Sequence, residues 1–297
     1  MKQIAALIRN ASAAALGLAA AACASQAAAE VRISIQDRDV ARTVTLGGSC
    51  NRCELSGRNL SGATFTGATF IGATMVGTNL RGAEMTGSNF SQSDFTRSNM
   101  TGAELNGANF TTAAFVDAAM NGIEASGGVF TRANMARVNL TGAEMSGVNM
   151  NGATLQDARL DGAEMFGATL ANVNARNASF QHVEMQASNM SSGDFSGVNF
   201  SGATLDNARF SGGLFARANF SGASLRRTDI RGVDLSRAVG LTQDQVGEAC
   251  ANDETRLPRG LQIGNCRSRV VIRMSPPAPP RAPAPPVPPV RNYAAAD

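Results

Sequence analysis

The sequence predicts a solenoid of square coils, and three features of its repeat support this. First, a large apolar residue returns at nearly every fifth position from Leu55 to Leu235. An α-helix repeats every ~3.6 residues and a strand about every two, so neither explains a period of five. Second, a small or β-branched residue stands two positions before most of these centres. Third, glycine is common two positions after them. Self-similarity at a short fixed period is typical of solenoids, in which each unit buries its apolar side against its neighbours.

Five residues fit one face of a coil together with its corner. The central residue and the small residue two positions before it then both point inward, while glycine or a small polar residue suits the tight turn. Four faces close a coil of 20 residues, so residues 20 positions apart lie above one another. At an interstrand spacing of about 4.8 Å, about nine coils form a rod about 43 Å long. One interior column is then expected to contain Phe70, Phe90, Phe110, Phe130, Met150, Leu170, Met190 and Phe210.

The repeat resembles that of a known family. Segments such as GAELNGANF (102–110) and GATLDNARF (202–210) match the pattern A-(D/N)-L-x-x of pentapeptide-repeat proteins. The resemblance covers about 180 of the 297 residues without a slip in phase. It implies an all-β fold, a right-handed quadrilateral β-helix over residues 54–238. It implies no particular function, because members of the family differ widely.

Residues 1–29 are expected to be a signal peptide. Lys2 and Arg9 lie near the start, an Ala/Leu run follows, and Ala27–Ala29 supplies a small-x-small cleavage site. A second interpretation is lipidation of Cys23, which follows three alanines. The apolar run is too short and too rich in alanine for a transmembrane helix, so membrane attachment is expected only if Cys23 is lipidated. We therefore expect a periplasmic or secreted protein.

Both ends of the repeat are expected to be capped, because open β-helix ends expose backbone groups that invite aggregation. Residues 30–53 predict short N-terminal strands that either cover the first coil or pair with a second copy, as in an end-to-end or cap-mediated dimer. Residues 239–274 break the phase and predict a small C-terminal cap, in which the segment Thr242–Gln245 resembles a capping box at the start of a short helix. This segment also resembles the C-terminal cap of exported pentapeptide-repeat proteins. Residues 275–297 form a proline-rich tail, expected to be a polyproline II spacer or a docking segment.

Four cysteines follow the signal peptide: Cys50, Cys53, Cys250 and Cys266. Four cysteines allow three pairings. Two of the pairings would join opposite ends of the rod, about 43 Å apart, whereas a disulfide needs Cα atoms within about 7 Å. The remaining pairing, Cys50–Cys53 with Cys250–Cys266, gives one disulfide at each end, as an oxidising compartment permits. The same separation excludes a four-cysteine zinc site, and the C-x-x-C motif lacks the βαβ context of a thioredoxin-like redox site.

Two outward columns carry regular charge. The first consists of glutamates 20 residues apart, expected to form a row with a spacing of about 4.8 Å: Glu84, Glu104, Glu124, Glu144, Glu164 and Glu184. This row is either a solvated stripe or a surface for a basic protein or a weakly bound divalent cation, although a flat row offers few ligands per ion. In the second column Arg97, Asp117, Arg137 and Asp157 alternate in sign. They predict salt bridges between coils, each worth about 0–1 kcal/mol.

No sequence feature predicts catalysis, a cofactor or a metal site. The single histidine, His182, is expected at an outward corner. The sequence lacks a nucleophile elbow, a phosphate-binding loop and a dinucleotide fingerprint, and a convex rod offers no cleft. The formal net charge of +3 provides no bulk attraction to nucleic acid.

These features together favour an exported, non-enzymatic β-helical scaffold or protein-interaction rod of the cell envelope, with an unidentified protein partner. The family resemblance supplies one alternative, since some members mimic B-form DNA and bind type II topoisomerases. Such mimics are strongly acidic, whereas residues 54–238 contain 13 arginines and 15 acidic residues. A second alternative is a cation-binding envelope protein that uses the glutamate row.

Overall fold

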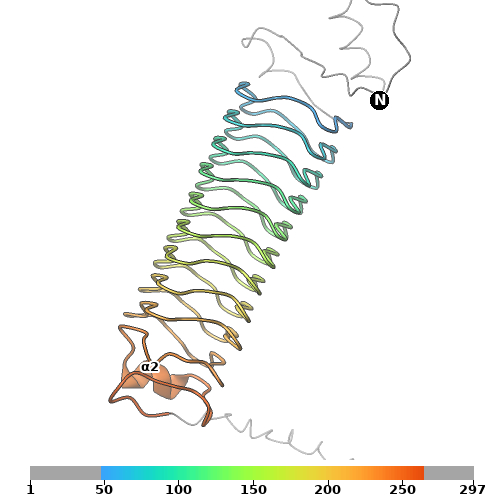
Figure 1. The fold of residues 1–297 in the computed structure, drawn as a ribbon. Helices are drawn as coiled ribbons and strands as arrows, with labels where there is room; N and C mark the ends of the chain where they lie inside the picture. The colour runs from blue at the N-terminus through green and yellow to red at the C-terminus, as the bar shows by residue number, and fades with distance from the viewer. Residues whose placement is uncertain (1–47, 264–297) are drawn as a thin grey trace, which may run out of the picture. The chain divides into compact units, whose positions relative to one another are not determined.

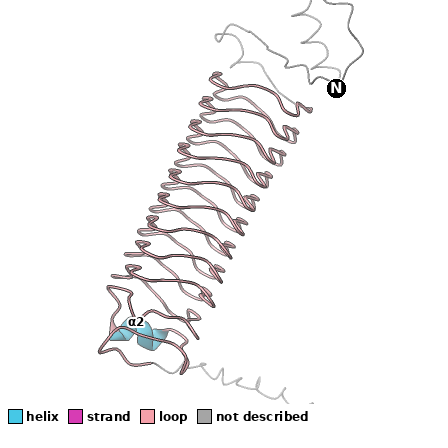
Figure 2. Cartoon of the chain, in the orientation of Figure 1, coloured by secondary structure: helices cyan, strands magenta, loops and turns pink. Residues whose placement is uncertain are grey.

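The computed structural model describes residues 48–263, and these residues form an elongated rod of stacked coils (Figure 1). Parallel β-bridges join residues 20 positions apart, from Ser49–Thr69 to Asn219–Val239. Each five-residue repeat contributes one bridge residue, which explains why Figure 2 draws the coils as loops and not as strands. The structure confirms the predicted β-solenoid with four faces per coil. The ladder begins at Ser49, a few residues before the predicted start at residue 54.

The corners explain the period of five. The amide of Ala63 donates to the carbonyl of Leu60 at 3.1 Å, and this closes a turn around Ser61 and Gly62. Gly62, the second turn residue, has φ of 67°, as a type II turn requires. Sixteen non-glycine residues of the described rod adopt the same conformation, including Arg52 and His182, with φ of 57° and 54°. The hydrogen bonds between coils hold these residues in a region of φ that side chains rarely adopt.

The interior is filled by the two inward columns of each face. The predicted column from Phe70 to Phe210 is fully buried, and its phenylalanine rings stack coil upon coil. The ring centroids of Phe70 and Phe90 are 5.2 Å apart, and those of Phe110 and Phe130 are 5.0 Å apart. Offset or stacked aromatic pairs at this distance add to the stabilisation from burial alone. The large centres therefore act as packing residues, as the sequence predicted.

Asparagine or aspartate often occupies the outward bridge position, and its side chain stabilises the next turn. The Oδ1 atom of Asn89 accepts a hydrogen bond from the amide of Ser91 at 3.1 Å, and Asp194 accepts one from Ser196 at 3.0 Å. This Asx arrangement satisfies an amide at the corner that would otherwise face solvent. The preference for Asn and Asp beside each centre thus has a local cause.

The described rod ends in a cap built on a short helix, α2 (Gln243–Glu248). Thr242 is its N-cap, and a capping box with Gln245 is present, as the sequence predicted. Val246 and Ala249 are buried, and the parallel ladder continues through Asp229–Cys250 and Asp234–Arg256 with a longer spacing. The cap thus extends the coil geometry over the end of the rod.

Several sequence predictions lie outside the described residues. These are the signal peptide (1–29), most of the N-terminal strands (30–47), the end of the C-terminal cap (264–274), the proline-rich tail (275–297), Cys23 and Cys266. Between residues 48 and 263, no helix is long and apolar enough to cross a membrane.

Candidate interaction face

The six predicted glutamates lie on one face of the rod, which we call the glutamate face. Its bridge residues form an unbroken parallel ladder from Thr64 through the glutamates to Thr204. All six glutamate side chains are exposed. Because adjacent strands lie about 4.8 Å apart, the row is a straight line of carboxylates along the rod.

The second residue of each corner beside this row lacks a side chain in five coils. The preceding corner has glycine in five successive coils, at residues 82, 102, 122, 142 and 162, and the following corner has glycine at 87, 107, 127, 147 and 167. A Cβ atom added at any of these glycines would meet nothing within 4 Å. Other corners of the rod hold Arg, Asp or Thr at a similar φ, so the turn itself does not demand glycine. The glutamates therefore have open space beside these glycines, whereas the first residue of each corner carries a side chain, such as Arg81 or Phe166.

The row has few partners of its own. Glu84 accepts a hydrogen bond from the hydroxyl of Thr64 at 3.1 Å. Within residues 48–263, none of the ion pairs involves a glutamate of the row. The same part of the chain contains no cluster of three His, Cys, Asp or Glu side chains that could hold a metal ion. The carboxylates are thus left to solvent or to a partner.

The alternating column of Arg and Asp is paired at its centre. Arg137 contacts Asp117 through two hydrogen bonds of 2.7 and 2.8 Å. This contact lowers the pKa of the Asp117 carboxyl and raises that of the Arg137 guanidinium. Among the described ion pairs neither Arg97 nor Asp157 takes part, although both lie in the same column. Only the central pair of the predicted salt-bridge column is therefore in contact.

The described cysteines lie at opposite ends of the rod. Cys50 and Cys53 flank the first turn, with 5.6 Å between their Cα atoms, which is within the range of a disulfide. Cys250 lies in the cap, where its backbone forms a parallel β-bridge with Asp229. Cys266 is outside the described residues, so the predicted pairing of Cys250 stays a prediction. The separation of the two ends agrees with the argument against a four-cysteine site.

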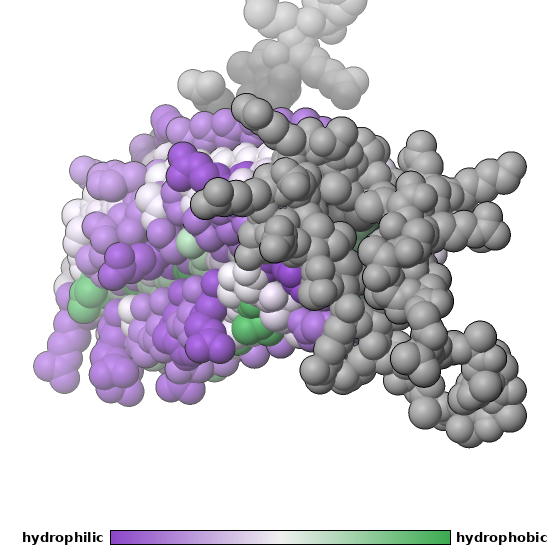
Figure 3. All heavy atoms as spheres, turned by 90° about the horizontal axis from the view of Figure 1, so that it is seen from above, coloured by the Kyte–Doolittle hydropathy of each residue, from purple (hydrophilic) through white to green (hydrophobic). Residues whose placement is uncertain are grey.

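Sequence reasoning did not anticipate the exposed apolar side chains. Seen end-on, the visible described surface is mostly hydrophilic, with isolated apolar residues (Figure 3). Phe166 is 60% exposed at the corner that follows Glu164, beside the glutamate row. Leu214 is 58% exposed on the opposite face, defined by bridge residues 54, 74 and so on to 234. A large apolar residue at a corner or bridge position, out of phase with the repeat, is the signal that would have identified both.

His182 lies at a corner, as predicted, with φ of 54°. Its imidazole lies over the glycine of the next coil, because a Cβ added at Gly202 would come within 2.4 Å of the His182 Nδ1 atom. The histidine thus packs on the turn below it.

Comparison with protein-family models finds matches over most of the rod. A model described as pentapeptide repeats matches residues 49–87, 75–111, 129–165 and 163–202, and a second model of pentapeptide repeats matches residues 195–239. Together these matches cover more than half of the 297 residues. A comparison with curated proteins finds no match.

Solved structures of similar proteins include two from different biological settings. One is HetL from the cyanobacterium Nostoc sp. strain PCC 7120, a pentapeptide repeat protein involved in the regulation of heterocyst differentiation. It is 22% identical over 72% of this chain and 86% of its own, with a TM-score of 0.37. The other is full-length QnrB1, a plasmid-mediated fluoroquinolone resistance protein. It is 19% identical over 69% of this chain and 94% of its own, with a TM-score of 0.40. Scores this low carry no argument about function.

Proposed function

The chain belongs to the pentapeptide-repeat family, and on that premise we propose that it is a non-enzymatic, exported β-helical rod that binds a basic protein partner in the cell envelope. We further propose that the rod is right-handed and has about nine coils. One observation carries the proposed binding: the glutamate row is exposed, and beside five of its six members the second residue of each flanking corner is glycine. A partner that approaches the carboxylates therefore meets no side chain at these glycine positions.

Charge and shape together support a basic partner. The row places six negative charges on one side of the rod, and no ion pair within the described residues neutralises them. Charged surfaces of this kind contribute mainly to partner selection and association rate, with a strong dependence on salt. Phe166, exposed beside Glu164, offers one apolar contact at the edge of the same face. An Arg-bearing protein surface with an apolar residue fits this arrangement.

The DNA-mimic alternative has less support. A mimic of the duplex needs negative charge around much of its surface, because phosphates line both strands. Here the regular row of carboxylates occupies one face, and the column of Arg97 and Arg137 lies at a corner on another side of the rod. The geometry thus favours a one-sided protein interface.

Binding of a hexa-arginine peptide tests the electrostatic part of the proposal. The triple variant Glu104→Gln, Glu124→Gln, Glu144→Gln should lose most of the salt-sensitive binding measured by fluorescence anisotropy. The matched control is Glu54→Gln, Asp94→Asn, Asp157→Asn, which removes the same charge from other surfaces and should bind nearly as well as the wild type. Equal losses in both variants would show that bulk charge, and not the row, attracts the peptide. A calcium titration of the same proteins tests the cation alternative.

Crosslinking in intact cells tests the partner itself. A photoreactive residue at Gly122 would lie beside the glutamate row, whereas one at Gly77 would lie at a glycine corner away from it; neither position has an atom within 4 Å of an added Cβ. We expect a defined crosslinked protein from position 122 and none from position 77. A product from both positions, or from neither, would contradict a specific interface on the glutamate face.

A further inference from the structure

The parallel ladder is interrupted at one place near the C-terminal end of the rod. On the opposite face, hydrogen bonds join each coil to the next down to Leu214, whose amide donates to Gly193 at 2.9 Å. The next step is different. Within the described residues, the amides of Gly212, Phe215 and Asp234 form no backbone hydrogen bond across to the facing coil, although the equivalent residues one coil earlier all do. We call this interruption, between residues 212–215 and 231–234, the seam.

The neighbouring faces of the same two coils are intact. Phe210 donates to Asp229 at 3.0 Å, and Phe220 donates to Val239 at 2.8 Å. Between them the register slips by one residue, because Arg217 donates to Arg237 where the repeat would place residue 236. The coils are therefore paired on both sides of the seam and separated along it.

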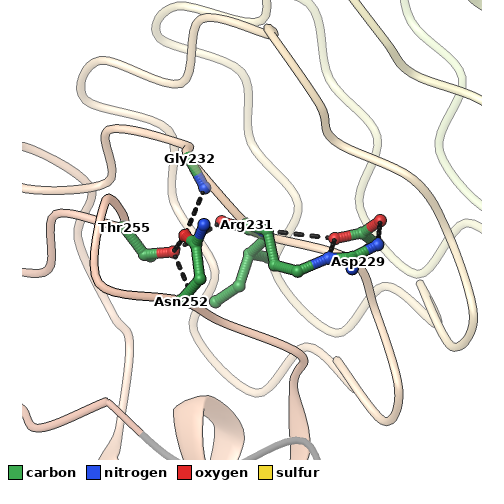
Figure 4. Close-up of polar contacts among 6 residues, drawn as sticks. Asp229, Arg231, Gly232, Asn252 and Thr255 are labelled. Carbon is green, nitrogen blue, oxygen red and sulfur yellow. Dashed lines mark hydrogen bonds and ion pairs between the residues drawn. The ribbon is translucent and has the colours of Figure 1, made fainter.

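The lower side of the seam keeps its hydrogen bonds to the cap. The amide of Gly232 donates to the Asn252 side chain at 2.8 Å (Figure 4). The Thr255 hydroxyl donates to the carbonyl of Ile230 at 3.0 Å. Leu235 donates to Arg256 at 2.7 Å, and Arg256 donates back to Val233 at 3.0 Å. Residues 231–236 thus belong to the cap by their hydrogen bonds, even though their sequence still follows the repeat.

The surface at the seam agrees with this division. Leu214 directly above it is 58% exposed, the most exposed large apolar residue at any bridge position of the described rod. The bridge partner of Asp234 is Arg256 in the cap, and the two side chains form an ion pair at 3.7 Å. Beneath the seam, the rings of Phe210 and Phe215 stack with centroids 4.4 Å apart and remain buried. Side chains alone therefore close the core at this point.

We propose that residues 231–236, together with the cap segment 251–257 to which they are bonded, form a flap that opens from the rod along the seam by local unfolding. The hinges lie at Asp229–Ile230 and at Arg237–Val239, where pairing with the coil above resumes. Opening uncovers the stacked rings of Phe210 and Phe215, while the rest of the rod stays folded. This device is independent of the glutamate face.

Amide hydrogen exchange of the full-length protein tests the flap. The amides of Leu235 and Arg256 are hydrogen-bonded to other residues of the flap, so they exchange only when the flap unfolds and should do so at a common rate. That rate should be about a hundredfold faster than the rate of Leu214, because three bonds are missing and each contributes about a fivefold factor. Asp229 and Val239, in the same coil but outside the flap, should exchange as slowly as Leu214. This comparison separates the flap from general fraying of the rod end.

Two outcomes would overturn the proposal. If Leu235 and Arg256 exchange as slowly as Leu214, the seam does not open. If Asp229 and Val239 exchange together with Leu235, the whole last coil frays and no flap exists. A disulfide across the seam, from Leu214→Cys with Asp234→Cys, should slow exchange of Leu235 to the rate of Leu214. The matched pair Asp194→Cys with Leu214→Cys spans an intact bridge and should leave exchange of Leu235 unchanged.

Discussion

The side chain of Gln245 forms hydrogen bonds both within the cap and to the coil above it. Its Oε1 atom accepts from the amide of Thr242 at 2.7 Å, and its Nε2 atom donates to the carbonyls of Phe220 and Ala223 at 2.8 and 2.7 Å. A net hydrogen bond contributes about 1 kcal/mol, so Gln245→Ala should lower the free energy of cap opening by about 3 kcal/mol. Hydrogen exchange of the Val246 amide, which is bonded to Thr242, reports this opening.

The Gln245→Glu variant makes the same prediction dependent on pH. At neutral pH a carboxylate oxygen would replace the donor and face two carbonyl oxygens, so the charged form is disfavoured and the pKa of the new carboxyl rises above its ordinary value of about 4.3. The cap should therefore be weakest above that raised pKa and should regain stability as pH falls through it, because the protonated acid can donate. The free energy of cap opening should therefore decrease as pH rises, as for any group whose pKa is higher in the folded state than in the unfolded state.

Gln243 provides the matched control. It lies in the same helix, and its side chain exchanges hydrogen bonds with Gln262 within the cap and none with the coils. Gln243→Glu should therefore show little change in exchange of Val246 between pH 7 and pH 3.5, after correction for the intrinsic rate. If Gln245→Glu behaves like Gln243→Glu, Gln245 does not anchor the cap.

Three further predictions follow from buried hydroxyls, a surface carboxylate and the chain ends. Ser98 and Ser188 have buried hydroxyls without a hydrogen-bond partner, so replacing either by alanine should raise the free energy of unfolding by about 1 kcal/mol. The control Ser93→Ala removes a 2.7 Å hydrogen bond and should lower the free energy of unfolding by a similar amount. Urea titrations measure both changes. Arg231 holds the pKa of Asp229 below its ordinary value. The stabilisation from this pair should be present above about pH 4 and disappear as pH falls through the lowered pKa, a loss that the Asp229→Asn variant should not show in acid titrations. The intact mass of the endogenous protein should correspond to a chain without its first 29 residues or to one lipidated at the N-terminus. Reduction of two disulfides should add about four protons to this mass. An intact N-terminus with free thiols would contradict export.

The period of five made most of the rod predictable. Once the centres from Leu55 to Leu235 are assigned to the interior, the 20-residue coil places every other residue on a face or a corner. The buried phenylalanine column and the exposed glutamate row follow from this assignment, and the structure confirms both positions. The capping box was also predictable, because its residue types and spacing are local.

The seam could not be predicted, because the repeat continues through it. Phe215, Ile230 and Leu235 keep the phase and remain buried, so the sequence gives no sign that the backbone ladder is broken between them. The amide of Gly232 still donates toward the cap, in the same direction as the equivalent amides of the other coils donate to the next coil. The pair of Asp117 and Arg137 was predicted from their 20-residue spacing, but that spacing alone did not show that Arg97 and Asp157 take no part in the described ion pairs.

Four faces of five residues each also restrict how this protein can change in length. Deleting or duplicating 20 residues would leave every downstream side chain on its own side of the rod. Removing a single repeat of five would instead rotate all that follows by a quarter turn, and the carboxylates beyond that point would move to the adjacent face. A continuous acidic row over six coils therefore marks a stretch in which insertions and deletions are tolerated only as whole turns of the coil.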